Sequence, residues 1–436
     1  MFYKNRFRKI AISACLTLFC VSPIFADDIE PNSLDATNGK TSVEYAQSIY
    51  QLMLAEMAIS REEYNNALAL YINLARNTHN EEVIKNAISL AVSLKAESVT
   101  NHLIDDWIKK APDSISAKVF KVRVLMIKGK LSQAEDLLNK IPPNKEYNDE
   151  ITYLKSLILL ELKDTQQALG LLETLNHSKY ESDASFFSAQ IYDMQNKTDL
   201  AIIWYSKVTD GKYVFQSNIR LAILLLQKGL VAKALSTVIY LKPENKKEAI
   251  TKITVQADLE LMLSKNKASV ITLTKGLSLV PHNSGFLYMR GLAYANLGQL
   301  SLAQVDFEEV LAKEPNNAEV LNALGYAIAN NSNRYQQAYD MISKALKITP
   351  DSPAIMDSMG WVLFKLGRYK EALIYLKKSY AAVPEGEIGA HYAVVLNKLG
   401  DIKSSKKIIN QIRSLQPSNK HAIDILKENN IDLNES

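Results

Sequence analysis

Two stretches of the chain carry the same pattern: SGFLYMRGLAYANLGQLSLAQVDFEEVLAKEP at 284–315 and PAIMDSMGWVLFKLGRYKEALIYLKKSYAAVP at 353–384. When the two are aligned, four kinds of position coincide: Gly291 with Gly360, Gly298 with Gly367, Ala303 with Ala372, and Pro315 with Pro384. Residues 318–350 fit the same alignment with one extra residue in the turn. Because several fixed offsets recur together, the pattern indicates a repeated structural unit of about 34 residues.

The repeat covers most of the chain. Eleven units begin at residues 48, 81, 115, 149, 182, 215, 250, 284, 318, 353 and 386. Eight of them carry an alanine at the same place in the second half: Ala67, Ala134, Ala168, Ala201, Ala234, Ala303, Ala338 and Ala372. Repeats running from 48 to about 417 leave no room for a separate catalytic domain.

This pattern resembles the tetratricopeptide repeat, a helix-turn-helix unit of about 34 residues. The resemblance implies an all-α fold, an α-solenoid (right-handed superhelix) of about eleven repeats over 48–417, followed by a capping helix and tail at 418–436. We expect Gly360, at position eight of its first helix, to let the two helices of a unit pack closely.

The turn between the helices of a unit is predicted to need a left-handed residue. Glycines occupy this position in five units: Gly129, Gly229, Gly298, Gly367 and Gly400. In the unit at 318, residues 330–333 (NNSN) stand there instead, and asparagine also tolerates the left-handed conformation.

The N-terminus predicts a secretory signal peptide over 1–26. Four basic residues lie within residues 1–9, and the uncharged stretch IAISACLTLFCVSPIFA follows at 10–26. We expect cleavage between Ala26 and Asp27, followed by a polar lead at 27–47. The alternative is a lipoprotein signal with Cys15 as the lipidated residue, but the apolar core before Cys15 is short.

The charge balance argues against a nucleic-acid partner. The whole chain has 51 lysines and arginines against 47 aspartates and glutamates, and the predicted signal peptide holds four of the basic residues. The mature chain is therefore expected to be neutral.

Both cysteines, Cys15 and Cys20, lie in the segment that would be removed, so no disulfide or thiol chemistry is expected.

A search for catalytic residues is negative. The six histidines are scattered without metal-ligand spacing, and we interpret each as a surface or turn residue. Carboxylate pairs such as Glu62 and Glu63 are expected on solvated helix faces. No phosphate-binding loop or nucleophile motif is present. We therefore expect no enzyme, no cofactor and no metal.

The resemblance implies that the first helices of successive repeats line an inner groove, with positions two, five, nine and twelve projecting into it. In the three units from 284 to 364 this predicts a protein-binding groove of seven residues: Tyr288, Leu292, Asn322, Tyr326, Asp357, Trp361 and Phe364. Aromatic anchors beside amides are typical of peptide-binding surfaces. The alternative is that Trp361 and Phe364 pack against the first helix of the next unit.

The chain also resembles one group of proteobacterial envelope proteins with tetratricopeptide repeats. The similarity is carried by YQLMLAEMAISREEYNNALALYINLARNTHNEEVIKNAISLA at 50–91, LNALGYAIANN at 321–331 and MDSMGWVLFKLGRYKEAL at 356–373. It implies a periplasmic, non-enzymatic scaffold. The more specific hypothesis that the resemblance implies is an adaptor that presents peptidoglycan hydrolases to a carboxy-terminal processing protease. Many members are outer-membrane lipoproteins, which is the alternative localisation. The alternative function is an assembly factor for polysaccharide export, pili or outer-membrane proteins.

Overall fold

The computed structural model describes residues 42–415 and 420–431, and all regular secondary structure within them is helical. The predicted cleavage site at Ala26 and Asp27 and most of the polar lead lie outside these residues. The chain divides into two compact units at residues 213 and 214. The prediction of an all-α repeat solenoid is confirmed.

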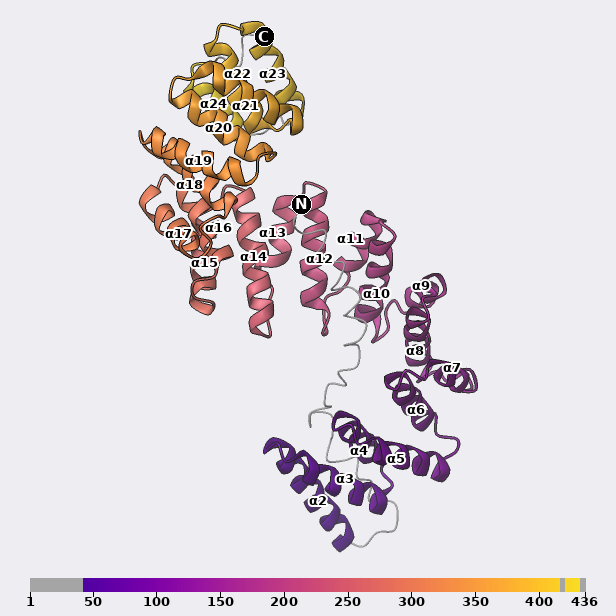
Figure 1. Ribbon diagram of the computed structural model, residues 1–436. Coiled ribbons are helices and arrows are strands. Elements are labelled where there is room, and N and C mark those ends of the chain that lie inside the picture. Colours follow the sequence, from indigo (N-terminus) through magenta and orange to yellow (C-terminus); the bar gives the residue numbers. More distant parts are fainter. Residues whose placement is uncertain (1–41, 416–419, 432–436) are drawn as a thin grey trace. The chain divides into compact units, whose positions relative to one another are not determined.

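The first unit consists of helix pairs, coloured indigo to magenta in Figure 1. Its helices are α2 (Ser42–Ser60), α3 (Tyr64–Thr78), α4 (Glu81–Ser93), α5 (Glu97–Lys110), α6 (Ile115–Ile127), α7 (Leu131–Asn139), α8 (Asn148–Glu161), α9 (Thr165–Glu173), α10 (Glu181–Met194) and α11 (Thr198–Ser206). Helix α2 begins six residues before the predicted start at 48, because residues 42–47 (SVEYAQ) contain no glycine or proline to stop it.

The second unit continues the alternation, from magenta to yellow in Figure 1. Its helices are α12 (Val214–Gln227), α13 (Val231–Ile239), α14 (Lys246–Met262), α15 (Asn266–Leu279), α16 (Ser284–Asn296), α17 (Leu300–Lys313), α18 (Ala318–Asn331), α19 (Tyr335–Ile348), α20 (Pro353–Lys365), α21 (Tyr369–Ala382), α22 (Gly386–Lys398), α23 (Ile402–Leu415) and α24 (Lys420–Glu428).

The even-numbered helices α2 to α22 are the first helices of the repeats, and the odd-numbered ones are the second helices. Each first helix packs chiefly on the second helix of its own repeat. In the second unit, neighbouring first helices also contact one another in an unbroken series from α12 to α22, whereas neighbouring second helices barely touch. The first helices therefore lie on the inner side of the curve in this unit.

Glycines at position eight allow the close approach of the two helices in a repeat. A Cβ atom added to Gly291 would lie 2.6 Å from Phe307 Cε1, and one added to Gly325 would lie 2.7 Å from Ile342 Cγ1. At Gly360 the added atom would overlap Leu376. The predicted packing role of Gly360 is therefore confirmed, and it explains why a helix tolerates glycine there.

The predicted turn glycines are confirmed, since Gly129, Gly229, Gly298, Gly367 and Gly400 all have φ between 68° and 84°. The prediction for residues 330–333 is wrong, because none of them is left-handed. Helix α18 runs on to Asn331, whose Nδ2 donates to Ala327 O at 3.0 Å. The Ser332 hydroxyl donates to Ile328 O at 2.7 Å. These side chains satisfy carbonyls at the helix end, so a left-handed residue is not required.

Helix α24 follows the last repeat and packs on α22. Its side chains Ala422, Ile425 and Leu426 are buried in a cluster with Trp361 and Val394. The segment from 418 thus contains a helix with a buried apolar face, and its described part is anchored to the last repeat.

Candidate protein-binding face

The seven predicted groove residues lie on α16, α18 and α20, which contact one another in sequence order. We call the side of the first helices that carries them the first-helix face. The structure divides the seven side chains into two groups. One group, called the engaged group, is packed in a cluster of polar and aromatic side chains. The other, called the open group, remains partly exposed.

Asp357 belongs to the engaged group, where it pairs with a histidine of the next first helix. Both Oδ atoms of Asp357 lie 3.0 Å from Nδ1 of His391 on α22. Only 6% of Asp357 and none of His391 is exposed. The interpretation of His391 as a surface or turn residue is wrong. It stands at position six of its unit, where other units place buried residues such as Leu154 but also exposed ones such as Met53, so the register alone does not reveal its burial.

Trp361 lies in the same interior cluster and is only 4% exposed. Its ring stacks on His391 with centroids 4.1 Å apart and on Phe364 at 5.0 Å. Its Nε1–H donates to Asn330 Oδ1 at 2.7 Å. The expectation that Trp361 and Asp357 project from the face is therefore wrong, because α22 covers both. Trp361 and Phe364 adopt the packing alternative.

Tyr326 joins this cluster to the C-terminal helix. Its hydroxyl donates to Glu387 Oε1 at 2.7 Å, and His421 Nε2 of α24 lies 3.3 Å from the same oxygen. Burial raises the pKa of Tyr326 well above its usual value. Burial would raise the pKa of Glu387 too, but the hydrogen bond with His421 and the nearby histidine charges outweigh it and hold that pKa at about 2. Tyr326 is thus held by structural contacts.

The open group consists of Tyr288, Leu292 and Asn322, all of which keep part of their surface exposed. The Tyr288 ring packs against Phe307 at a centroid distance of 6.1 Å, and burial followed by the charge of Glu319 raises its pKa to about 12. Asn322 Oδ1 is shielded from solvent and accepts no hydrogen bond from the described residues. A shielded acceptor without a donor is costly, and a ligand could reach this oxygen only after the side chain moves.

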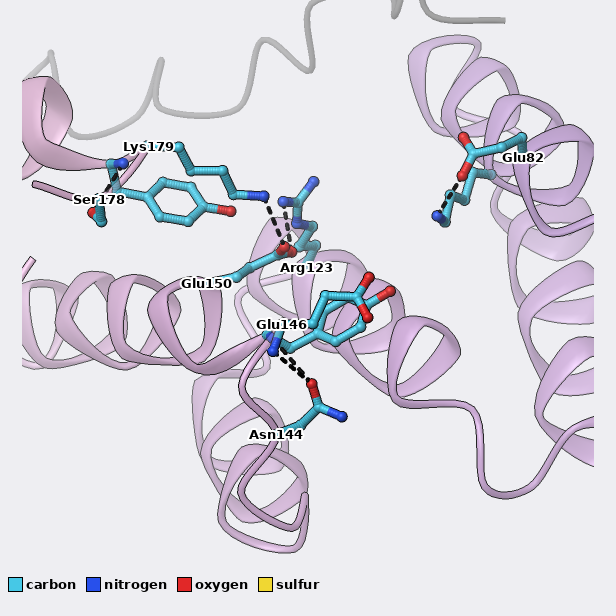
Figure 2. A network of polar contacts seen from close by, with 10 residues as sticks. Glu82, Arg123, Asn144, Glu146, Glu150, Ser178 and Lys179 are labelled. Atoms are coloured by element: carbon cyan, nitrogen blue, oxygen red, sulfur yellow. Dashed lines mark hydrogen bonds and ion pairs between the residues drawn. The ribbon is translucent and has the colours of Figure 1, made fainter. Parts of the chain in front are cut away.

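The first-helix face of the first unit has a different character, because its charges are paired within the unit. Figure 2 shows Glu150 between Arg123, whose Nη2 donates at 2.7 Å, and Lys179, whose Nζ lies 4.0 Å away. On the neighbouring turn, the Tyr153 hydroxyl donates to Asp183 Oδ2 at 2.8 Å. These pairs connect α6 with α8 and α8 with α10.

Two further searches cover only the residues that the structure describes. Among them, no group of three or more histidine, cysteine, aspartate or glutamate side chains is arranged to hold a metal ion. Within the same ranges, none of the helices combines the length and apolar character needed to cross a bilayer.

Comparison with known proteins identifies the repeat. Residues 288–353 and 354–382 match two family models, both described as tetratricopeptide repeat. The TPR repeat-containing protein PA4667 of Pseudomonas aeruginosa is 31% identical over 210 residues, or 48% of this chain and 36% of that protein. The chain therefore spans about a third of the length of the curated relative that it matches.

Solved structures of tetratricopeptide repeat proteins match part of the chain at low sequence identity. A tetratricopeptide repeat protein from Parabacteroides merdae is 14% identical, with 57% of this chain and 98% of that chain covered and a TM-score of 0.49. TTC0263 of Thermus thermophilus is 17% identical, with coverage of 43% and 97% and a TM-score of 0.37. Residues 288–382 thus match the tetratricopeptide repeat, and they form part of an all-α repeat solenoid.

Proposed function

We propose that this protein is a non-enzymatic scaffold that binds partner proteins through extended peptide segments on the first-helix face of its second unit. The observation that carries the proposal is the open group on α16 and α18, where Tyr288, Leu292 and Asn322 lie partly exposed. A partly exposed ring and an aliphatic side chain supply apolar contact, and a partly exposed amide residue beside them is typical of peptide-binding surfaces.

The finer form of the proposal is a periplasmic adaptor that brings peptidoglycan hydrolases to a carboxy-terminal processing protease. Its support is the resemblance of residues 50–91, 321–331 and 356–373 to envelope proteins of that kind, together with the signal-like residues 1–26. Secretion by cleavage between Ala26 and Asp27 places the scaffold in the periplasm, where both partner classes act.

The test is capture from a periplasmic extract by the chain starting at Asp27, with partners identified by mass spectrometry. A Tyr288→Ala/Asn322→Ala variant, called the open-group variant, removes two of the three open side chains. A Leu302→Ala/Val305→Ala variant is the matched control, because these side chains on α17 are 48% and 62% exposed on a second helix. Far-ultraviolet circular dichroism checks that both variants keep their helices.

We expect the wild type and the control to retain a processing protease together with wall hydrolases, and the open-group variant to lose them. Equal capture by the wild type, the control and the open-group variant would show that the binding site lies on another face. Retention of a pilus or export component without any protease would replace the adaptor role by an assembly role. Capture of nothing specific would overturn the scaffold function itself.

A further inference from the structure

Helix α24 does not continue the stack of repeats. A first helix that extended the array would pack on the second helix before it, as α22 packs on α21. Instead, α24 packs on α22, and its backbone barely approaches that of α23, the helix before it in the chain. Figure 1 shows α24 at the yellow end of the chain. The helix therefore lies against the last repeat and does not extend the array.

The surface that α24 covers is the first-helix face of the last repeat. Glu387, Ala390 and Val394 stand at positions two, five and nine of that repeat. His421 Nε2 of α24 lies 3.3 Å from Glu387 Oε1. Ala390 and Val394 share a buried cluster with three side chains of α24, namely Ala422, Ile425 and Leu426. The open group stands at positions five and nine of α16 and α18, so α24 occupies the kind of position that the proposed function assigns to a partner.

The contacts of α24 define what this surface accepts. His421, which becomes a cation on protonation, faces the carboxylate of Glu387. Two buried aliphatic side chains, Ile425 and Leu426, follow four and five residues later, which puts them on the same side of the helix as the histidine. Lys427 points away from the cluster and is exposed. The surface therefore accepts a short amphipathic helix with a basic residue near its start.

Helix α24 depends on this docking for its own structure. It has nine residues, whereas isolated helices shorter than about 12–15 residues are marginal in water. Its polar contact is open to solvent, since 61% of the His421 side chain and 39% of the Glu387 side chain are exposed. Undocking would therefore melt α24 and uncover Ala390 and Val394, while α22 keeps α21 and α23 as its packing partners.

We propose that α24 is an autoinhibitory segment, which covers the first-helix face of the last repeat until an amphipathic helix of a partner protein displaces it. The displacing helix carries a basic side chain opposite Glu387 and aliphatic side chains four and five residues later. Because α24 belongs to the same chain, it competes at an effective concentration on the order of millimolar. The inference rests on the proposed scaffold function and adds a regulatory element to it.

The test uncovers the surface in the full mature chain. Ile425→Asp/Leu426→Asp, called the released variant, puts two carboxylates into the apolar contact of α24. Lys427→Asp is the matched control, because it lowers the net charge by the same amount at an exposed position of the same helix. Hydrogen exchange should show that residues 420–428 lose protection in the released variant, while residues 386–415 stay as protected as in the wild type.

The probe is a labelled, end-blocked peptide with the sequence of residues 420–431, KHAIDILKENNI, and fluorescence anisotropy measures its binding. We expect the released variant to bind this peptide at least about tenfold more tightly than the wild type and the Lys427→Asp control do, because the competing α24 is undocked only in the released variant.

Peptide variants identify the chemistry of the surface. A peptide with His421→Arg should bind the released variant within about threefold of the original peptide, because arginine also supplies a cation to Glu387. A peptide with His421→Glu should bind at least about tenfold more weakly, since like charges then face each other. Adding Glu387→Gln to the released variant should abolish this preference for a basic residue.

Four results would overturn the inference. The first is equal peptide binding, or none, by the wild type and the released variant. The second is the same affinity for the His421→Arg and His421→Glu peptides. The third is loss of protection in residues 386–415 of the released variant, which would make α24 a structural cap. The fourth is a wild-type dimer in light scattering that the released variant does not form, which would assign the surface to α24 of a second copy.

The scaffold function is decided separately by the extract capture described above, because the open-group variant leaves α24 unchanged. Failure of the peptide to bind would therefore remove the autoinhibitory role of α24 without removing the proposed scaffold.

Discussion

At the residue scale, the small residue at position eight sets how closely two helices of a repeat approach. Gly360→Ala would push a methyl group into Leu376, while a methyl group at Gly170 on α9 would meet no atom within 4 Å, which makes Gly170→Ala the control. We expect Gly360→Ala to destabilise the protein by about 1–3 kcal/mol through overpacking. Gly170→Ala should stabilise it by about 0.5–1 kcal/mol through helix propensity. Urea unfolding followed by circular dichroism measures both, and equal midpoints would contradict the packing role.

The packing role of Gly360 can be predicted from the sequence, because small residues recur at fixed offsets where the two helices of a repeat must approach closely. It predicts Trp361 poorly for a physical reason. A position nine side chain faces outward unless the next first helix carries a partner that covers it. Here that partner is His391, which stacks on the indole and pairs with Asp357. This cluster does not recur with the repeat, so the repeat pattern cannot predict it.

Tyr288, Leu292 and Asn322 could be placed on the face from register alone. The shielding of Asn322 Oδ1 could not, because it depends on which side chains from other helices come near.

At the element scale, the attachment of α24 to α22 depends on pH through His421 and Glu387. The hydrogen bond to Glu387 raises the pKa of His421 above 6.5, so the stabilisation from this histidine is complete below pH 6.5 and is lost as the pH rises through the raised value. The pKa of Glu387 is lowered from 4.5 to about 2, so its contribution is present above pH 4.5 and is lost as the pH falls toward 2.

Helix α24 should therefore be held most firmly between about pH 4.5 and 6.5. Hydrogen exchange at pH 5.5 and pH 8.0, corrected for intrinsic rates, should show lower protection of residues 420–428 at the higher pH. His421→Gln should remove most of the difference, because glutamine does not titrate. The apolar contacts of Ile425 and Leu426 keep the helix docked in both cases. Identical protection at the two pH values in the wild type would show that the ion pair contributes nothing to docking.

At the scale of the whole molecule, the two compact units have separate hydrophobic clusters and different first-helix faces. The first unit buries Tyr71, Leu74 and Ile88 in its own core, and its acidic face residues are paired. The second buries Phe307, Leu324 and Ile342 and carries the partly exposed open group. A repeat array derives its stability from each repeat and its neighbours, so either unit can retain its helices when the other is removed.

We accordingly expect a fragment of residues 214–436 to fold, and to capture the same partner proteins from the periplasmic extract as the full mature chain, because the open group lies within this unit. A fragment of residues 42–213 should fold as well but fail to capture them, since it lacks the open group. Circular dichroism establishes folding, and mass spectrometry identifies the captured proteins. Capture of the same partners by the 42–213 fragment alone would show that the open group is not the binding site, and would remove the physical basis for assigning recognition to the second unit.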